Sequence, residues 1–425
     1  MAFTTWRNEL QATLQDIRNK GLEKVERNIA TAQAAEITCQ FPPGSEPRKV
    51  LNFCANNYLG LSSHPAIIKA AHDALDRWGY GLSSVRFICG TQDLHRDLER
   101  KLSEFLGTEE TILFSSCFDA NAAVFEVLKK GDLIIADRLI HASLVDGIKL
   151  CEAEHDSYKN ADMEHLEEKL QLAKERRALP ADDPKHVNHV LIVTDGVFSM
   201  DGNFAPLDKI VQLGETYDAM VLVDDSHATG FIGKGGRGVH EHCGVFGKID
   251  LITTTFGKAL GGASGGCVSG RKEVIDYLRQ RGRPYLFSNS VAPSICAGTI
   301  KALELINESG ELRERLIRNV THFRTEMDKL GFVLKGEYAI APVMLFNAKL
   351  AQDFAADMYA EGIYVIGFSF PVVPNGQARI RVQLSAAHEP EHVDRCVAAF
   401  KKVGEKYGIL GLKKKEILAK YPEAQ

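Results

Sequence analysis

The segment Val221-Leu-Val-Asp-Asp-Ser-His227 closes an apolar run, Ala219–Val223, with two acids and a histidine. An apolar run of this length is typical of a buried strand. A helical pattern over Leu207–Tyr217 precedes it, and a second strand-like run, Val190–Val193, precedes that helical pattern. A strand, a helix and a strand in this order predict two neighbouring parallel strands.

The same alternation occurs earlier in the chain. Two more strand-like runs are each followed by a helical pattern, namely Thr111–Phe114 before Ala120–Lys130 and Leu133–Ala136 before Leu144–Leu150. Within Asp93–Leu106 the apolar residues recur every three or four positions, so this segment is expected to form a helix that covers the sheet. The sequence therefore predicts an α/β fold, with a mostly parallel sheet and helices on both faces.

The pattern changes after about residue 300. A long helical stretch, Leu303–Leu330, is followed by shorter runs of both kinds: Val343–Phe346, Ala351–Glu361, Tyr364–Ile366, Ala378–Val382 and Glu391–Tyr407. These runs predict a smaller C-terminal α/β domain. The Lys-rich tail, Gly411–Gln425, is expected to form a solvated terminal helix.

The N-terminal region has helical spacing from Thr5 to about Ala35 and then the proline-rich run Phe41–Pro47, which we interpret as a linker. The expected division is thus an N-terminal arm over residues 1–60, a large domain over 61–300 and a small domain over 301–425. The large and small units have the usual size of domains, and the N-terminal arm is too short to count as a domain of its own.

The composition limits the classes of function. The chain has 425 residues, with 51 Lys and Arg against 56 Asp and Glu, and the charges are interspersed, so a nucleic-acid partner is not expected. Nine cysteines are dispersed without a C-x-x-C pair, which favours a reducing compartment. No apolar run reaches the length of about 20 residues needed to span a membrane, and the first residues mix acids with arginines. We expect a cytoplasmic protein without a membrane partner.

Polar residues follow several of the predicted strands, where ligands of parallel α/β sheets bind. Asp224 and His227 follow one strand, and Lys258 follows Leu251–Thr255 on a glycine-rich turn. A lysine with a lowered pKa bonds covalently to carbonyl compounds, and pyridoxal 5'-phosphate is the cofactor that uses such a lysine with a carboxylate on its ring nitrogen. Its phosphate would bind where Ser116-Cys117-Phe118 begins a helix, with the hydroxyls of Thr255 and Ser288.

Two motifs resemble those of a known family. Val223-Asp-Asp-Ser-His-Ala-Thr-Gly230 and Thr253-Thr-Thr-Phe-Gly-Lys-Ala-Leu-Gly-Gly262 are similar to the signature of the α-oxoamine synthases, which have the aspartate-aminotransferase-like fold (fold type I) of pyridoxal-phosphate enzymes. The similarity extends from Asn56 to Arg381. It implies a homodimeric enzyme that joins an amino acid to an acyl-CoA and releases CoA, usually with CO2.

Three further runs resemble most the family members that join glycine to acetyl-CoA in threonine breakdown, without loss of CO2: Ser84–Asp93, Cys117–Asn121 and Arg283–Ser290. The small-molecule substrates implied are therefore glycine and acetyl-CoA. Members with longer donors, such as succinyl-CoA, pimeloyl-CoA or palmitoyl-CoA, are the alternative, because the size of the acyl pocket cannot be inferred from one sequence. A catalytically silent subunit is disfavoured because Lys258 is present.

The resemblance also implies roles for single residues. Lys258 would hold the cofactor and take the α-proton of glycine, His141 would stack on the ring, Asp224 would pair with the ring nitrogen, and His227 would pair with the 3'-oxygen. Ser199 would lie at the same edge. Asn56, Arg381 and His141 would contact the substrate, while Cys117, Phe118, Thr255 and Ser288 would surround the phosphate. Asn289 would reach a phosphate in the neighbouring subunit.

Three other patterns compete with this interpretation. Gly233–Gly238 satisfies the G-x-G-x-x-G pattern, but several residues separate it from the preceding strand, so a dinucleotide site is not favoured. His240, His242 and Cys243 resemble metal ligands without a second cluster at zinc-finger spacing, and no metal is expected. Cys117 with His141 could form a thiol nucleophile, but Cys117 is better explained as a small residue at the start of the phosphate-binding helix.

Overall fold

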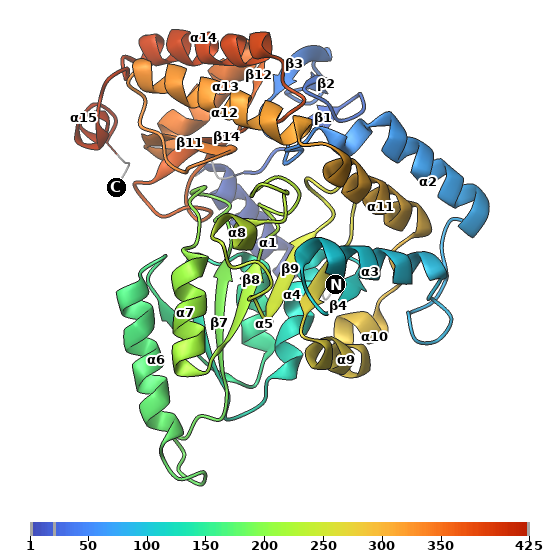
Figure 1. Ribbon diagram of the computed structural model, residues 1–425. Coiled ribbons are helices and arrows are strands. Elements are labelled where there is room, and N and C mark those ends of the chain that lie inside the picture. Colours follow the sequence, from blue (N-terminus) through green and yellow to red (C-terminus); the bar gives the residue numbers. More distant parts are fainter. Residues whose placement is uncertain (1–2, 20–22, 423–425) are drawn as a thin grey trace.

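The computed structural model describes residues 3–19 and 23–422 (Figure 1). Its largest element is a seven-stranded sheet in the order β4-β10-β9-β8-β7-β5-β6. The strands are β4 (Glu110–Phe114), β5 (Leu133–Asp137), β6 (Glu154–Tyr158), β7 (Val190–Asp195), β8 (Met220–Asp224), β9 (Leu251–Thr255) and β10 (Gly266–Gly270). The strand β10 runs antiparallel to both of its neighbours, β4 and β9, and the other pairs of this sheet are parallel. The prediction of a mostly parallel sheet is confirmed.

Both faces of this sheet are buried, because successive residues of the central strands enter different apolar clusters. Val221 and Val223 of β8 belong to one cluster, and Leu222 between them belongs to the other. The first face is covered by α3 (Asp93–Leu106), α6 (Met163–Arg177), α7 (Leu207–Tyr217) and α11 (Pro293–Glu308). The second is covered by α4 (Cys117–Ala123), α5 (Ala142–Leu150), α9 (Lys272–Arg281) and α10 (Arg283–Phe287).

Two helical predictions had the wrong extent. The helix expected over Ala120–Lys130 begins at Cys117 instead and gives way to the 3₁₀ turn η2 (Val124–Val127). The long stretch Leu303–Leu330 is divided, since α11 ends at Glu308 and α12 spans Glu311–Lys329. Ser309 and Gly310 separate the two helices, and neither residue favours the interior of a helix. The remaining helical elements between residues 61 and 300 are η1 (Leu61–Ser63), α2 (Pro65–Trp78) and α8 (Val239–His242).

The C-terminal residues form a three-stranded antiparallel sheet in the order β11-β14-β13. Its strands are β11 (Ile340–Phe346), β13 (Gly367–Phe368) and β14 (Ala378–Gln383), and its helices are α12, α13 (Ala348–Ala360), α14 (Pro390–Tyr407) and α15 (Lys414–Lys420). Figure 1 shows α13 and α14 on the side of the molecule away from the large sheet. The terminal helix α15 was expected to be solvated. The structure differs, because Ile417 of this helix is only 2% exposed.

The N-terminal region differs from the sequence prediction. The helix α1 spans Thr4–Asn19, but a short strand, β1 (Asn28–Ile29), follows where helix was expected. The run Phe41–Pro47 connects the antiparallel strands β2 (Glu36–Gln40) and β3 (Arg48–Asn52), so it is a hairpin connection. The strand β3 also pairs in parallel with β12 (Ile363–Tyr364), which places this region beside C-terminal residues. The three-part domain division stays a prediction.

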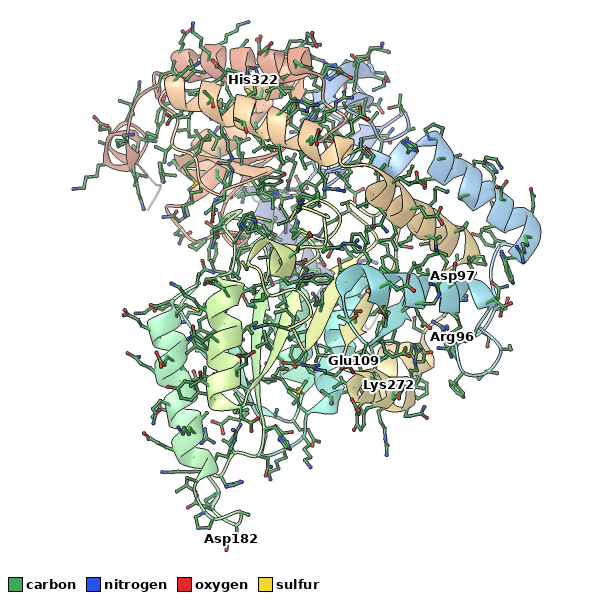
Figure 2. The ribbon with its side chains drawn as sticks, viewed as in Figure 1. Arg96, Asp97, Glu109, Asp182, Lys272 and His322 are labelled. Atoms are coloured by element: carbon green, nitrogen blue, oxygen red, sulfur yellow. The ribbon has the colours of Figure 1, made fainter. Side chains whose placement is uncertain are left out.

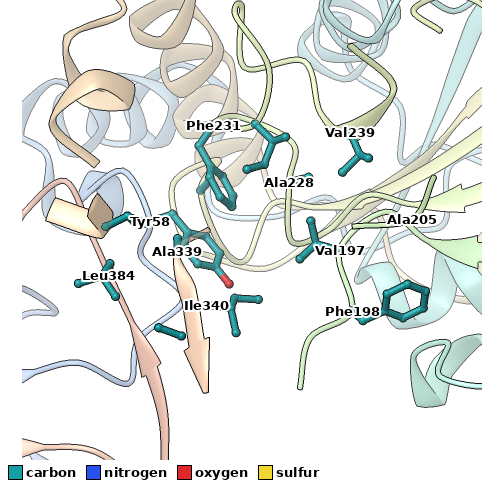
Figure 3. Close-up of a cluster of buried hydrophobic side chains, with 14 of the residues drawn as sticks. Tyr58, Val197, Phe198, Ala205, Ala228, Phe231, Val239, Ala339, Ile340 and Leu384 are labelled. Atoms are coloured by element: carbon teal, nitrogen blue, oxygen red, sulfur yellow. The ribbon is translucent and has the colours of Figure 1, made fainter. Parts of the chain in front are cut away.

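The C-terminal strands pack on the loops of the large sheet through apolar side chains. Figure 3 shows Ile340 and Leu384 on one side and Val197 on the other, with Tyr58 and Phe231 beside them. These side chains are buried and belong to one continuous cluster. The loops that follow β7 and β8 are therefore held against β11 and β14.

Charged side chains such as Arg96, Glu109 and Lys272 lie exposed on the outside of the molecule (Figure 2). Several of them form ion pairs at the surface, including Arg271 with Glu109. Within residues 3–19 and 23–422, no helix combines the length and the apolar character needed to span a membrane.

Candidate active site

A cavity of about 230 Å³ lies beyond the carboxyl ends of β7, β8 and β9. The register of the sheet explains its position, because Asp195 at the end of β7 lies opposite Asp224 at the end of β8. Many of the residues predicted for the site line this cavity: Cys117, Phe118, His141, Asp224, His227, Thr255 and Lys258. Residues far apart in the sequence thus meet where parallel sheets bind ligands.

Asp224 is 5% exposed and is held by two hydrogen bonds. Its Oδ1 accepts the backbone N–H of Ser226 at 3.0 Å, and its Oδ2 accepts Nδ2 of Asn121 at 2.7 Å. The two donors fix the orientation of the carboxylate. Asp224 is therefore a fixed negative charge in the cavity wall, suited to hold a proton on a ring nitrogen.

Lys258 follows β9 on a turn that requires glycine. Gly261 and Gly262 have φ angles of 107° and 77°, and the N–H of Gly262 donates to the carbonyl oxygen of Phe256 at 3.0 Å. Burial lowers the pKa of Lys258 below that of a free lysine, against the opposing negative charge of Asp224. A larger fraction of uncharged amine follows, and the uncharged amine is the form that attacks a carbonyl carbon.

His141 is the N-cap residue of α5 and lies in the cavity wall. Its backbone N–H donates to Oδ1 of Asp195 at 3.0 Å, and its Nδ1 lies 2.7 Å from Oγ of Ser143. The surrounding protein and the positive charge of Lys258 lower the pKa of His141, while Asp224 opposes this shift. The imidazole is consequently neutral near pH 7 and can cover an aromatic ring without adding charge.

His227 is buried beside Tyr58, whose hydroxyl lies 2.8 Å from Nδ1 of His227. Burial lowers the pKa of His227 well below its usual value, and the positive charge of Lys258 adds to the effect. Burial also raises the pKa of Tyr58, so the phenol keeps its proton. Both side chains are neutral, and their contact holds His227 at the cavity.

The end of the cavity beside α4 has the groups expected for a phosphate. The N–H groups of Cys117 and Phe118 lie in the first turn of α4, where a helix has no internal acceptor for them. Gly266 of β10 allows the close approach of α4, because a Cβ atom there would lie 2.6 Å from the backbone of Cys117. The hydroxyl of Thr255 accepts the N–H of Gly257 at 3.1 Å and faces the same cavity.

The remaining phosphate residues lie outside the cavity wall. The hydroxyl of Ser288 is 3.1 Å from that of Ser115, which precedes the start of α4. Asn289 is exposed to solvent and does not line the cavity. The role predicted for Asn289 belongs to a second subunit and stays a prediction.

The substrate residues approach from the C-terminal side. Nη1 of Arg381, on β14, donates to the carbonyl oxygen of Ser199 at 3.1 Å, which places Ser199 beside Arg381. Nε2 of Gln383 donates to Oδ1 of Asn56 at 3.1 Å. The Nε atom of Arg381 is buried without a hydrogen-bond partner among the described residues. An anionic group of a substrate would satisfy that donor.

Sequence reasoning assigned no role to several residues of this site. Asp195 follows a predicted strand, as Asp224 does, so the rule that found Asp224 applies to it as well. Burial and the negative charge of Asp224 raise the pKa of Asp195 well above its usual value. Ser143 and Tyr58 had no such signal, since each reaches the site through a contact between separate segments.

The competing patterns have structural explanations. The carboxylate of Glu241 accepts the N–H of Gly235 at 2.9 Å and that of Arg237 at 3.0 Å, so the glycine-rich loop is closed by its own chain. His240 is buried and stacks on Phe246. Burial and the charge of Asp224 raise the pKa of Cys117 well above its usual value, which makes this thiol a poor nucleophile.

The residues of the cavity fit pyridoxal phosphate. A half-buried lysine, a hydrogen-bonded carboxylate, two neutral histidines and a helix start surround one space of about 230 Å³, which suits a molecule with a single ring. The lowered pKa of Lys258 matches a carbonyl cofactor.

Comparisons with known proteins identify the family of the chain. Residues 48–400 match the family model described as aminotransferase class I and II. The chain is 54% identical to the 2-amino-3-ketobutyrate coenzyme A ligase of Escherichia coli K12 over 95% of this chain and 98% of that protein. It is 41% identical to the 8-amino-7-oxononanoate synthase of Fervidobacterium nodosum, over 94% and 98%.

A solved structure is similar over nearly the whole chain. It is a serine palmitoyltransferase from S. paucimobilis with a bound PLP–myriocin aldimine, with a TM-score of 0.85 and 29% sequence identity. The match covers 96% of this chain and 99% of that one. The fold, including the C-terminal sheet, is therefore shared with a protein that binds pyridoxal phosphate.

Proposed function

The chain belongs to the class I and II aminotransferase family and, within it, to the α-oxoamine synthases, and we propose that it joins glycine to acetyl-CoA and releases CoA. The product is 2-amino-3-ketobutyrate. Cleavage of the bond between its amino-bearing carbon and its keto carbon gives the carbon skeletons of glycine and an acetyl group. The name of the Escherichia coli relative thus specifies both substrates by their chemistry.

One observation carries the proposal: a half-buried lysine with a lowered pKa lies in one cavity with a hydrogen-bonded carboxylate, on a chain 54% identical to a 2-amino-3-ketobutyrate coenzyme A ligase. The identity to the oxononanoate synthase is 41% over a similar span. The difference favours acetyl-CoA over a longer acyl donor.

The cofactor is pyridoxal phosphate, which, when bound, withdraws electrons from the carbon that loses its proton. Lys258 would hold it through Nζ, and Asp224 and His227 would bind its ring nitrogen and ring oxygen. The first turn of α4, Thr255 and Ser288 would hold its phosphate. These assignments use the side chains that line or adjoin the cavity.

Protein side chains would bind glycine and transfer its proton. Nζ of Lys258, whose lowered pKa increases the fraction of uncharged amine, would accept the α-proton of glycine. Arg381 and Asn56 would hold the carboxylate of glycine, and the neutral His141 would cover the reacting face. Asp224 supplies a negative charge that is already in place, so little reorganisation is needed during the reaction.

A homodimer with shared active sites is part of the proposal. Phe118 and Phe287, which flank the phosphate region, are 49% and 70% exposed. Exposed aromatic side chains of this kind are enriched at protein interfaces. A second subunit covering them would bring its Asn289 near the phosphate.

A cytoplasmic location is also proposed. It is supported by the cysteines, all of which are free thiols, including the exposed Cys89. Free thiols of this number persist in a reducing compartment.

The proposal is tested by measuring release of the CoA thiol with glycine as amino donor. Acetyl-, succinyl-, pimeloyl- and palmitoyl-CoA are compared at equal concentrations, with alanine and serine in place of glycine as controls. We expect the highest kcat/KM with glycine and acetyl-CoA. A higher value with a longer donor would reject the acetyl assignment while keeping the family.

A further inference from the structure

Asp224 and His141, the two side chains that would contact the cofactor ring, are connected by a chain of hydrogen bonds through Asn121 and Ser143. Nδ2 of Asn121, on α4, lies 2.7 Å from Oδ2 of Asp224 and 2.9 Å from Oγ of Ser143. Oγ of Ser143, on α5, lies 2.7 Å from Nδ1 of His141. Asn121 and Ser143 are each 1% exposed, so these bonds are shielded from water.

The chemistry of the groups fixes the direction of each bond. A carboxylate only accepts, so the amide nitrogen of Asn121 faces Asp224 and its second N–H donates to Oγ of Ser143. The amide oxygen of Asn121 is buried without a partner among the described residues, so the two donors alone set its orientation. The single hydroxyl proton of Ser143 is then left for Nδ1 of His141.

A second contact leads independently to the same result. The backbone N–H of Ser143 donates to Nδ1 of His141 at 3.3 Å as the cap of α5. An atom that accepts an N–H carries no proton of its own. In a neutral imidazole the proton must then be on Nε2.

The packing of α4 against α5 makes this contact possible. Gly147 lies at the crossing, and a Cβ atom there would be 2.6 Å from the carbonyl oxygen of Asn121 and 2.7 Å from the ring of Phe125. The absence of a side chain at Gly147 therefore allows α5 to bring Ser143 to Asn121.

We propose that Asn121 and Ser143 are positioning residues that keep the proton of His141 on Nε2 and hold the carboxylate of Asp224 as part of the same unit. The proposal rests on the proposed function, since it concerns the residues around pyridoxal phosphate. His141 presents an N–H donor on its Nε2 side. The other titratable groups that line the same cavity are Lys258, Asp195, His227 and Cys117.

The test compares Asn121→Ala and Ser143→Ala with Asn319→Ala in the purified holoprotein. Asn319 is a matched control, because it is a buried amide with two hydrogen bonds, to the carbonyl oxygens of Ser385 and His388. The readouts are the pH midpoint of the absorbance of the lysine-bound cofactor and the dissociation constant of pyridoxal phosphate.

Loss of the donor to Asp224 destabilises the ionised carboxylate, so the proton that it shares with the ring nitrogen would move towards Asp224, and a less positive ring tolerates a second proton nearby. We expect Asn121→Ala to raise the pH midpoint by about one unit and to weaken cofactor binding about tenfold. Ser143→Ala should shift the midpoint in the same direction by less, because the backbone N–H of Ser143 remains. Asn319→Ala should lower the unfolding temperature without a shift of the midpoint.

The two single substitutions should also be non-additive when combined, as expected for members of one hydrogen-bonded chain. An unchanged midpoint in folded Asn121→Ala and in Ser143→Ala would overturn the proposal. If Asn121→Ala does not fold, Ser143→Ala decides alone. Failure of the proposed function is distinguishable, because the unsubstituted protein would then show no cofactor absorbance or no release of CoA.

Discussion

The two ends of the seven-stranded sheet differ in the size and the chemistry of their cavities. A cavity of about 780 Å³ lies at the amino ends of β7 and β8, whereas the one beyond their carboxyl ends measures about 230 Å³. In the larger cavity, Arg271 is already paired with Asp250 and Glu109. In the smaller, Asp224 lies in the same wall as Lys258, and the pKa of that lysine is lowered.

This difference shows that the direction of the strands, rather than the volume of a cavity, locates the chemistry. At the carboxyl ends the chain leaves each strand through a loop that begins the next helix, so side chains from several strands and the first turns of helices converge. At the amino ends the loops follow helices and their charges pair at the surface. The predictions below test this contrast from the largest expected effect to the smallest.

Lys258→Ala should have the largest effect. Without Nζ no group in the cavity would hold the cofactor covalently or accept the α-proton, so kcat should fall by about 10³-fold or more. The absorbance band of the lysine-bound cofactor should disappear, as measured by spectroscopy of the purified protein. Near-normal turnover in this variant would show that the catalytic lysine lies elsewhere.

Two matched substitutions compare the ends directly. Asp224→Asn should lower kcat by about 10²–10³-fold, because a preorganised charge is lost at the reacting centre. Asp132→Asn changes a carboxyl group that is 2% exposed at the amino end and accepts the N–H of Lys129 at 2.9 Å. It should leave kcat/KM within about twofold and change only the unfolding free energy.

Steady-state kinetics and denaturant unfolding of both variants provide the measurement. Equal losses of kcat in the Asp224 and Asp132 variants, after correction for the folded fraction, would contradict the contrast between the two ends.

Arg381→Lys should have a smaller effect that is specific to substrate binding. A lysine keeps the charge but loses the planar pair of donors that matches a carboxylate. The KM for glycine should rise by about tenfold or more, with a smaller change in kcat and an unchanged KM for acetyl-CoA. A change confined to the KM for acetyl-CoA would instead place Arg381 at the CoA site.

The sequence located the carboxyl-end residues well, and the reason is local. Asp224 and Lys258 each follow an apolar run directly, so a strand and its polar end can be identified from neighbouring residues. Asp195 satisfies the same criterion. Asn121 and Ser143 do not, because their contact depends on the crossing of α4 and α5 at Gly147.

The strands that were missed also have a physical explanation. β10 contains the residues Gly-Cys-Val-Ser-Gly, whose glycines have little strand propensity, and it is held in place by β4 and β9 on its two sides. β6 is an edge strand with mostly exposed residues, so it lacks an apolar run. β2 and β3 pair in a hairpin whose connection is rich in proline.

The smallest effect concerns His388, a buried histidine away from both ends of the seven-stranded sheet. It shows how burial changes the pKa of a histidine outside the active site. Nε2 of His388 donates to the carbonyl oxygen of Asn52, and its Nδ1 accepts the N–H of Ser385. Burial lowers the pKa of His388 to about 4. The folded-state pKa of His388 is below the unfolded value of about 6.5. The neutral His388 therefore contributes to the stability of the folded protein above about pH 6.5, and this contribution is lost as the pH falls towards 4.

We expect His388 to lower the unfolding free energy by about 1–2 kcal/mol between pH 8 and pH 5. The change should be absent in His388→Gln, when both proteins are unfolded with denaturant across this pH range. An identical pH dependence in the two proteins would show that other groups cause it.

The most direct test of the carboxyl-end site is reduction of the holoprotein with borohydride, followed by peptide mapping. Reduction makes the bond between the cofactor and its lysine permanent, so the modified residue can be identified by mass spectrometry. We predict a pyridoxyl group on Lys258 and none on Lys129 or Lys248, which line the amino-end cavity. A pyridoxyl group on any other lysine, with Lys258 unmodified, would contradict the assignment of the active site.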